Sequence, residues 1–223
     1  FYYEPLIDGK NLVFLAGGSG ITPFMSILRE VVDRKLDLNI WVIYGSRVPN
    51  DVIFAKELDE IAKRHRNVKY TIVISEPPKS WGGLCGFLNK DIISEHVATV
   101  EGKTFYICGP QAMYAFCQGE LESLKIPRRK IRRESYGPPD DVTKEPGWPT
   151  GLSPDSEFTV EVVGKKTFKA RAGEPLMNSL ERESIVIPAV CRSGVCTTCR
   201  TKLVSGKVFM PSTVTLLEGD RRF

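Results

Sequence analysis

The first 136 residues alternate between short apolar runs and segments whose apolar residues recur at helical spacing. The short runs are rich in β-branched and aromatic residues, which is typical of buried strands. They predict strands at residues 11–16, 38–44, 68–74, 104–108 and 130–136. The segments between them predict helices at residues 53–65, 87–97 and 112–124, and one that begins near residue 23. Strands separated by helices indicate a doubly wound parallel α/β sheet.

The pattern changes after residue 136. Residues 137–155 are rich in proline and glycine, which cannot sustain a helix or a central strand, so they predict a fairly stiff linker. Residues 157–163 and 166–172 then predict a hairpin around Gly164, followed by a helix at 174–183 and a strand at 200–204. We therefore expect a small α+β domain over residues 156–223.

Composition narrows the class of protein. With 42% hydrophobic and 26% charged residues, the chain is typical of ordinary soluble proteins. No apolar run approaches the roughly 20 residues of a transmembrane helix. The net charge of +4 argues against nucleic acid as a partner. We interpret the basic cluster at 125–133 as a solvated strand edge or helix end, although a docking or nucleotide-phosphate role stays open.

Three of the six cysteines lie together, in the sequence Cys191-Arg-Ser-Gly-Val-Cys196-Thr-Thr-Cys199. This C-x₄-C-x₂-C spacing is that of plant-type [2Fe–2S] loops, in which thiolates hold the irons. The alternatives are a zinc site or three ordinary thiols. Zinc usually takes paired C-x₂-C motifs or histidines, and both histidines of the chain lie in the first domain. Clustered metal-ligating cysteines favour a reducing compartment, and we expect a cytoplasmic protein.

A glycine-rich segment, residues 17–23 (Gly-Gly-Ser-Gly-Ile-Thr-Pro), joins the first predicted strand to a helix with Thr22 as N-cap and Pro23 at its first position. Glycines let a backbone approach a pyrophosphate, and a helix N-terminus supplies free N–H groups. Residues 44–47 (Tyr-Gly-Ser-Arg) and 108–110 (Cys-Gly-Pro) end later strands at the same edge. Three such signals predict a dinucleotide site. Its nucleotide stays open, because Arg47 suits a 2′-phosphate whereas Asp51 suits a ribose hydroxyl.

These three motifs resemble the NAD(P) domain of the ferredoxin–NADP⁺ reductase superfamily, and the cysteine loop resembles the plant-type ferredoxin family with its β-grasp fold. The order of the two domains is similar to that in phthalate dioxygenase reductase and related oxygenase reductases. The resemblance implies catalytic roles for Cys108, beside the nicotinamide, and Glu134, near the flavin, and metal ligation by Cys191, Cys196 and Cys199. It implies cofactor contacts by Gly17, Gly18, Ser19, Gly20, Thr22, Pro23, Ser46, Arg47, Gly109, Pro110 and Tyr136.

The resemblance also implies parts outside this stretch. Residues 1–9 resemble the exit segment of a flavin-binding barrel, which would hold FAD or FMN. Ferredoxins of this type have a fourth cysteine ligand, and none follows Cys199, so we expect it beyond Phe223. The implied activity is electron flow from NAD(P)H through flavin and cluster to an acceptor protein such as an oxygenase. Two alternatives are a nucleotide- and cluster-binding carrier fragment without turnover and a zinc-binding adaptor.

Overall fold

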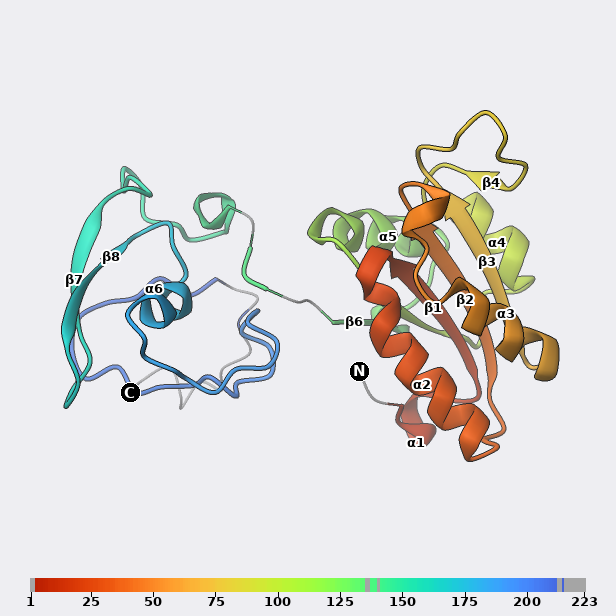
Figure 1. Ribbon diagram of the computed structural model, residues 1–223, viewed down its shortest axis with the longest axis horizontal. Coiled ribbons are helices and arrows are strands. Elements are labelled where there is room, and N and C mark those ends of the chain that lie inside the picture. The colour runs from red at the N-terminus through yellow and green to blue at the C-terminus, as the bar shows by residue number, and fades with distance from the viewer. Residues whose placement is uncertain (1–2, 135–136, 140, 212–213, 215–223) are drawn as a thin grey trace. The chain divides into compact units, whose positions relative to one another are not determined.

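The computed structural model describes residues 3–134, 137–139, 141–211 and 214. They divide into two compact units, Phe1–Glu134 and Ser135–Phe223, which are described separately (Figure 1). The first unit is an α/β domain around a six-stranded parallel sheet, and the second is a small domain that contains a two-stranded sheet. The predicted fold class is confirmed in both units.

The sheet of the first unit has the strand order β4-β3-β2-β1-β5-β6, with every neighbouring pair parallel. Its strands are β1 Asn11–Gly17, β2 Asn39–Ser46, β3 Val68–Ile74, β4 Leu84–Cys85, β5 Thr104–Cys108 and β6 Ile131–Arg133. The chain adds β2 to β4 on one side of β1 and then crosses to add β5 and β6 on the other. The carboxyl ends of β1 and β5 therefore flank the switch point where doubly wound sheets bind ligands.

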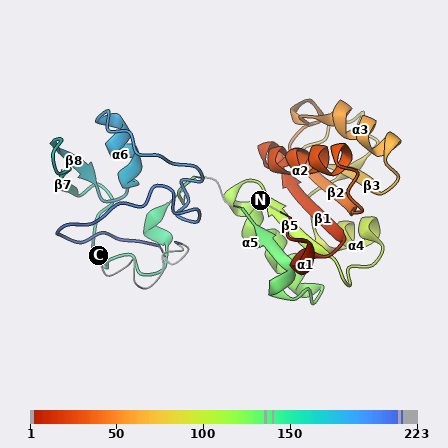
Figure 2. The ribbon, with the colours of Figure 1, turned by 90° about the horizontal axis from the view of Figure 1, so that it is seen from below.

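Helices cover both faces of this sheet (Figure 2). The helices of the first unit are α1 Pro5–Asp8, α2 Ile21–Asp33, α3 Ala55–Arg64, α4 Lys90–Val97 and α5 Gln111–Ser123, with 3₁₀ turns η1 Gly18–Gly20, η2 Pro49–Asp51 and η3 Arg128–Lys130. Helices α2 and α3 share one buried cluster with the sheet, and α4 and α5 share the other. A strand with helices on both faces must be apolar on both, which is why β1 is a continuous apolar run.

Alternate residues of β1 enter the two cores. Phe14 packs toward α2, where its ring stacks on Phe24 at 4.6 Å between centroids and meets Tyr106 edge-on at 5.5 Å. Val13 and Leu15 point into the opposite cluster. All of these side chains are fully or almost fully buried. The continuous apolar run of β1 thus lies at the centre of the domain.

The boundaries of some elements differ from the prediction. Helix α2 begins at Ile21, and its N-cap Gly20 already has helical backbone angles and caps with no side chain. Thr22 is therefore not the N-cap, because the 3₁₀ turn η1 leads directly into the helix. Helix α4 begins at Lys90, later than predicted, because the Asn89 side chain caps it by accepting the N–H of Ile92.

The second unit is built on a hairpin and one helix. Strands β7 Glu157–Glu161 and β8 Thr167–Arg171 pair antiparallel, and α6 Leu176–Arg182 packs on them. The buried residues of this core are Phe168, Ala170, Leu180 and Ile185. The predicted strand at 200–204 is wrong, because those residues form no described strand and are exposed. β-Propensity alone makes no strand where there is no neighbouring strand to pair with.

The proline-rich segment predicted as a linker packs within the second unit. Its 3₁₀ turn η4 Val142–Lys144 precedes Trp148, whose ring meets Phe209 edge-on at 5.2 Å. The Gly137 N–H donates to the Cys191 carbonyl at 2.9 Å, and the Gly173 N–H donates to the Pro154 carbonyl at 2.8 Å. These contacts make the segment a folded border of the second unit.

Candidate nucleotide site and cysteine loop

Two loops meet at the switch point of the sheet. One runs from the end of β1 through η1 into α2, and the other runs from Cys108 through Gly109 and Pro110 into α5. Because β1 and β5 are paired neighbours, both loops leave the same edge of the sheet side by side. The structure therefore brings together the first and third motifs predicted from the sequence.

Glycines let these two loops touch backbone to backbone. A Cβ on Gly20 would lie 2.1 Å from the Cys108 carbonyl oxygen, and a Cβ on Gly109 would lie 3.1 Å from the Gly17 Cα. Gly18 is different, because a Cβ there would meet nothing within 4 Å, while its φ of +52° favours glycine. The sequence suggested one purpose for all these glycines. The structure separates those needed for loop packing from the one needed for backbone conformation.

The predicted pyrophosphate end lies at the start of α2. The Ser19 and Thr22 side chains are exposed there, and the first turn of the helix holds no acidic residue. Pro23 lacks an N–H, so it donates nothing. The turn thus combines two hydroxyls with the positive end of a helix of 13 residues, a setting that favours an anion.

The second motif ends β2 at the same edge. Ser46 is almost fully buried, and its hydroxyl donates to the Val48 carbonyl at 3.2 Å. Arg47 is exposed, with its Nε 4.0 Å from Asp51 Oδ2. Ser46 therefore shapes the turn, whereas the Arg47 guanidinium and the Asp51 carboxylate present opposite charges at the surface.

Cys108 ends β5 and is fully buried. Burial raises the pKa of its thiol to about 11, although a hydrogen bond with Tyr114 acts in the opposite direction. The thiol is therefore protonated at neutral pH, so it can donate its S–H but cannot serve as a base. Glu134 follows β6, and its N–H donates to the Ile107 carbonyl at 3.3 Å. Tyr136 lies outside the described residues.

Tyr114, a residue that the motifs did not indicate, connects these groups. It belongs to the first turn of α5 and is buried. Its hydroxyl accepts the Gly109 N–H at 3.3 Å and donates to the Glu134 carbonyl. In the sequence it is one of several apolar or aromatic residues on a helix, so only the tertiary contact distinguishes it.

A buried ion pair, also absent from the sequence prediction, fastens the N-terminal segment to the sheet. Asp8 is 1% exposed, and its Oδ1 accepts from Arg132 Nε at 3.1 Å and Nη2 at 3.0 Å. The Thr104 hydroxyl donates to the Asp8 carbonyl at 2.6 Å, and Lys130 Nζ donates to the Ile7 carbonyl at 2.9 Å. Part of the basic cluster at 125–133 therefore has a structural role.

The cysteine loop lies in the second unit. Cys191 is buried, and its sulfur accepts the N–H groups of Ser193 at 3.4 Å and Cys196 at 3.3 Å. Cys196 is exposed and Cys199 is partly buried. Hydrogen bonds from Thr198 and from the Cys191 backbone lower the pKa of Cys196 to about 6. Thiolate character and backbone N–H bonds to sulfur are what an iron–sulfur loop requires.

The donor types of this loop fit a [2Fe–2S] cluster. In the part of the chain that the structure describes, no three Cys, His, Asp or Glu side chains converge closely enough to hold a metal ion. Positive φ angles at Arg192, Gly194 and Thr197 turn the loop sharply between its cysteines. The backbone therefore turns as a wrapping loop does.

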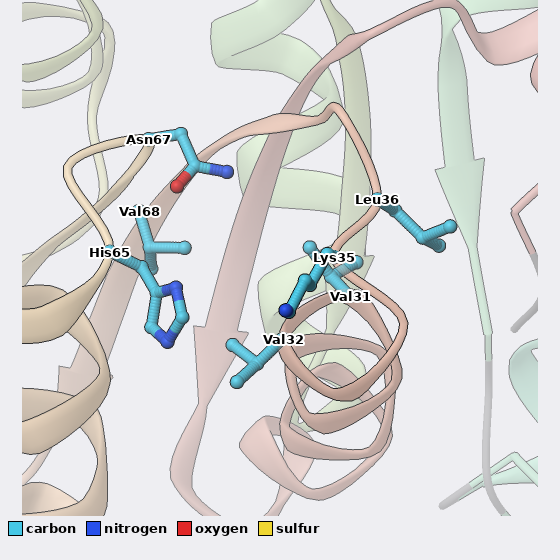
Figure 3. A pocket seen from close by; sticks show the side chains of 7 residues that line it. All are labelled: Val31, Val32, Lys35, Leu36, His65, Asn67 and Val68. Atoms are coloured by element: carbon cyan, nitrogen blue, oxygen red, sulfur yellow. The ribbon is translucent and has the colours of Figure 1, made fainter.

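Two cavities in the described part of the chain lie away from both candidate sites. A cavity of about 190 Å³ lies at the other edge of the sheet, where the end of α2 meets the start of β3 (Figure 3). A larger one of about 470 Å³ lies beside α2 and Tyr3. Neither is lined by a predicted site residue. A site made of backbone N–H groups at a sheet edge does not need a deep cavity.

Comparison with known families assigns both units. Residues 14–119 match the family described as oxidoreductase NAD-binding domain, and residues 160–222 match the 2Fe-2S iron-sulfur cluster binding domain. The chain carries an NAD-binding oxidoreductase domain followed by a 2Fe–2S ferredoxin domain. The second match includes all three clustered cysteines.

Curated relatives match over most of the chain. NADH oxidoreductase HCR of Escherichia coli (strain K12) is 31% identical over 94% of this chain and 59% of its own length. The glycine betaine monooxygenase reductase subunit of Pseudomonas aeruginosa is 25% identical over 90% of this chain and 58% of its own length. The chain thus spans less than two thirds of these relatives.

Solved structures match a little more than half of the chain. The cytochrome b5 reductase domain of Ulva prolifera nitrate reductase gives a TM-score of 0.52 at 25% identity, over 56% of this chain and 49% of that one. The Amycolatopsis cytochrome P450 reductase GcoB gives 0.50 at 28% identity, over 59% and 39%. In the described residues, no helix is long and apolar enough to cross a membrane.

Proposed function

We propose that this chain is part of a flavin-dependent NAD(P)H oxidoreductase that passes electrons through a [2Fe–2S] cluster to an acceptor protein such as an oxygenase. The observation that carries the proposal is the pairing of two units in one chain. One unit has backbone-lined loops at the switch point of an NAD-binding sheet, and the other has the C-x₄-C-x₂-C loop. The first unit suits the binding of a hydride donor, and the second unit suits the binding of a carrier of single electrons.

A flavin explains how these two chemistries are joined. A nicotinamide gives two electrons as hydride, a [2Fe–2S] cluster takes one at a time, and a bound flavin supplies the conversion. The names of the relatives support this function, because they include an NADH oxidoreductase and a reductase subunit of a monooxygenase. FAD and FMN are both compatible with it.

In the nucleotide site, we assign the pyrophosphate to the turn that contains Gly17, Gly18, Ser19, Gly20, Thr22 and Pro23. The free N–H groups and the positive end of α2 would hold its charge. Gly109 and Pro110 would form the opposite wall. Cys108 would donate its S–H toward the nicotinamide once the turn uncovers it, and Glu134 and Tyr136 would lie toward the flavin.

In the second unit, we assign Cys191, Cys196 and Cys199 as three of the four ligands that a [2Fe–2S] cluster needs. Zinc would replace the iron if the loop belonged to an adaptor. Metal and sulfide analysis of the purified full-length protein distinguishes the iron–sulfur cluster from the zinc site. Iron with equimolar sulfide supports the reductase, whereas zinc without sulfide contradicts it.

Turnover is the direct test of the proposal. The full-length protein should contain flavin, reduce an artificial dye with NADH or NADPH, and give a rhombic EPR signal after reduction. Cys108→Ala should slow flavin reduction by NAD(P)H about tenfold, the rate change expected for one hydrogen bond of ordinary strength, and leave cluster absorbance unchanged. A full-length protein that binds both cofactors and still reduces no dye would support the carrier alternative.

The choice of nucleotide depends on the two opposite charges at the end of β2. If Arg47 holds a 2′-phosphate, Arg47→Ala should weaken NADPH much more than NADH. If Asp51 holds a ribose hydroxyl, Asp51→Asn should weaken NADH and improve NADPH, because the negative charge beside the 2′-phosphate is gone. Equal changes in the affinity for NADH and NADPH would show that neither residue contacts the adenosine end of the nucleotide.

A further inference from the structure

The hydroxyl of Tyr114 joins three parts of the proposed nicotinamide end. It accepts the Gly109 N–H, donates to the Glu134 carbonyl and lies within hydrogen-bonding reach of the Cys108 sulfur. These partners come from the end of β5 and the residue after β6, while Tyr114 comes from α5, which lies against β5 (Figure 2). A single buried side chain thus connects three elements.

Tyr114 adds a side-chain hydrogen bond to a turn that is otherwise held by loop packing and by the Met113 N–H, which donates to the Pro110 carbonyl at 2.9 Å. Pro110 has no N–H, so the Gly109 N–H is a principal donor of the turn between β5 and α5. The same turn touches the pyrophosphate loop, because Gly109 and Cys108 pack against Gly17 and Gly20 with no room for a Cβ. A shift of the turn at Gly109 would therefore move both predicted ends of the nucleotide site.

The phenol has a single hydrogen, which limits the hydrogen bonds that the Tyr114 hydroxyl can make. A tyrosine hydroxyl has one hydrogen to donate and can accept two hydrogen bonds. Here that hydrogen goes to the Glu134 carbonyl and one acceptor position goes to Gly109. The hydrogen that serves the Glu134 carbonyl cannot serve the Cys108 sulfur at the same time. A rotation of the phenol hydrogen toward sulfur would release the Glu134 carbonyl at the same time.

We propose that Tyr114 is a positioning residue for hydride transfer, whose hydroxyl fixes the Cys108–Gly109 turn against the end of β6. The inference rests on the proposed function, because it takes Cys108 to lie at the nicotinamide end. Tyr114 itself need not touch the nucleotide. Its effect is on the orientation of the thiol and on the distance between the two loops.

Tyr114→Phe in the full-length reductase tests this, since it removes the hydroxyl and keeps the ring. We expect the rate of flavin reduction at saturating NAD(P)H to fall about tenfold, the rate change expected when one hydrogen bond of ordinary strength is lost. The nucleotide Kd should change less than threefold. The matched control is Tyr70→Phe, which removes a hydroxyl that donates to Asp59 at 3.3 Å, remote from the switch point. It should leave both values unchanged.

A second measurement needs no turnover. Without nucleotide, alkylation of Cys108, followed by mass spectrometry of its peptide, should accelerate at least fivefold in Tyr114→Phe and not in Tyr70→Phe. Unchanged flavin reduction together with unchanged alkylation would overturn the proposal. If alkylation is faster in Tyr114→Phe but the wild-type protein does not oxidise NAD(P)H, the proposed function is contradicted. The role of the Tyr114 hydroxyl in holding the Cys108–Gly109 turn is then still supported.

If Tyr114→Phe does not accumulate as folded protein, amide hydrogen exchange in the wild type tests whether the hydrogen bond from Gly109 to Tyr114 holds the turn. The Gly109 amide should then exchange at least tenfold more slowly than in an unfolded chain. Exchange near the unfolded rate would show that the hydrogen bond from Gly109 to Tyr114 does not hold the turn, and would overturn the proposal.

Discussion

The two units prepare their sites in opposite ways. In the first, the loops at the switch point are fixed by a core with fully buried strands, and Gly20 and Gly109 lock them together before any nucleotide arrives. In the second, one hairpin and one helix form a small core, and the cysteine loop is held by a few backbone hydrogen bonds. A large core positions a ligand site by itself, whereas a small domain depends on its ligand to complete the fold.

Loss of the cluster should therefore have the largest effect. Cys196→Ser should abolish the EPR signal of the full-length protein and lower the melting temperature of the second unit, because metal binding supplies folding free energy there. The matched control is Cys85→Ser, an exposed cysteine of the first unit, which should change neither. An unchanged melting transition of the second unit in Cys196→Ser would contradict this contrast.

The core of the first unit should be the next most sensitive. Phe14→Ala removes a ring that contacts Phe24 and Tyr106, and we expect a loss of about 3–5 kcal/mol in unfolding free energy. Chemical denaturation, with cluster absorbance recorded in parallel, measures both units. The cluster should survive while the first unit unfolds earlier. Phe158→Ala, at a residue that is 51% exposed, is the control and should have little effect.

The packed loops should tolerate a methyl group at one glycine and not at the other. Gly20→Ala places a Cβ 2.1 Å from the Cys108 carbonyl oxygen, which forces the loops apart, at a cost of about 1–3 kcal/mol typical of overpacking. NAD(P)H binding, measured by titration, should weaken at least tenfold. Gly18→Ala meets open space and carries only the strain of its positive φ, about 1 kcal/mol. Equal losses would mean that loop packing is not what sets the affinity.

The smallest effect concerns Asp8, which ties α1 to the sheet. Burial raises the pKa of this carboxyl, but hydrogen bonds from the Glu4 N–H and from Arg132 outweigh it and hold the pKa below its usual 3.8. The ionised form therefore stabilises the fold at neutral pH, and this contribution disappears as the pH falls below about 3.8 and through the lower folded-state pKa.

Asp8→Asn should accordingly lower the unfolding free energy of the first unit by about 2 kcal/mol at pH 7, the value of hydrogen bonds to a charged group. The difference from wild type should shrink as the pH falls toward 3. Asp37→Asn, which breaks an exposed pair with Lys10, is the control and should show no comparable change. A difference that is constant with pH would contradict the role of the Asp8 charge.

Much of the nucleotide domain could be predicted because its signals are local. The run of β1 and the spacing of α2 follow from burial on both faces of a strand and on one face of a helix. The start of α2 could not be placed, because a 3₁₀ turn competes with a Thr-Pro signal that is valid in isolation. The strand predicted at 200–204 failed for a related reason, since strand formation needs a partner that sequence alone does not supply.

By itself the sequence determined the alternation of strands and helices, the glycine and cysteine motifs, and the kind of ligand that each motif suits. These depend on residue type and spacing within a short stretch. Only the tertiary structure decided that Gly20 packs against Cys108, that Arg132 pairs with Asp8, and that Tyr114 joins β5 to the end of β6. Each of these contacts links residues that are far apart along the chain or on different elements, and it exists only once the strands have taken their order in the sheet.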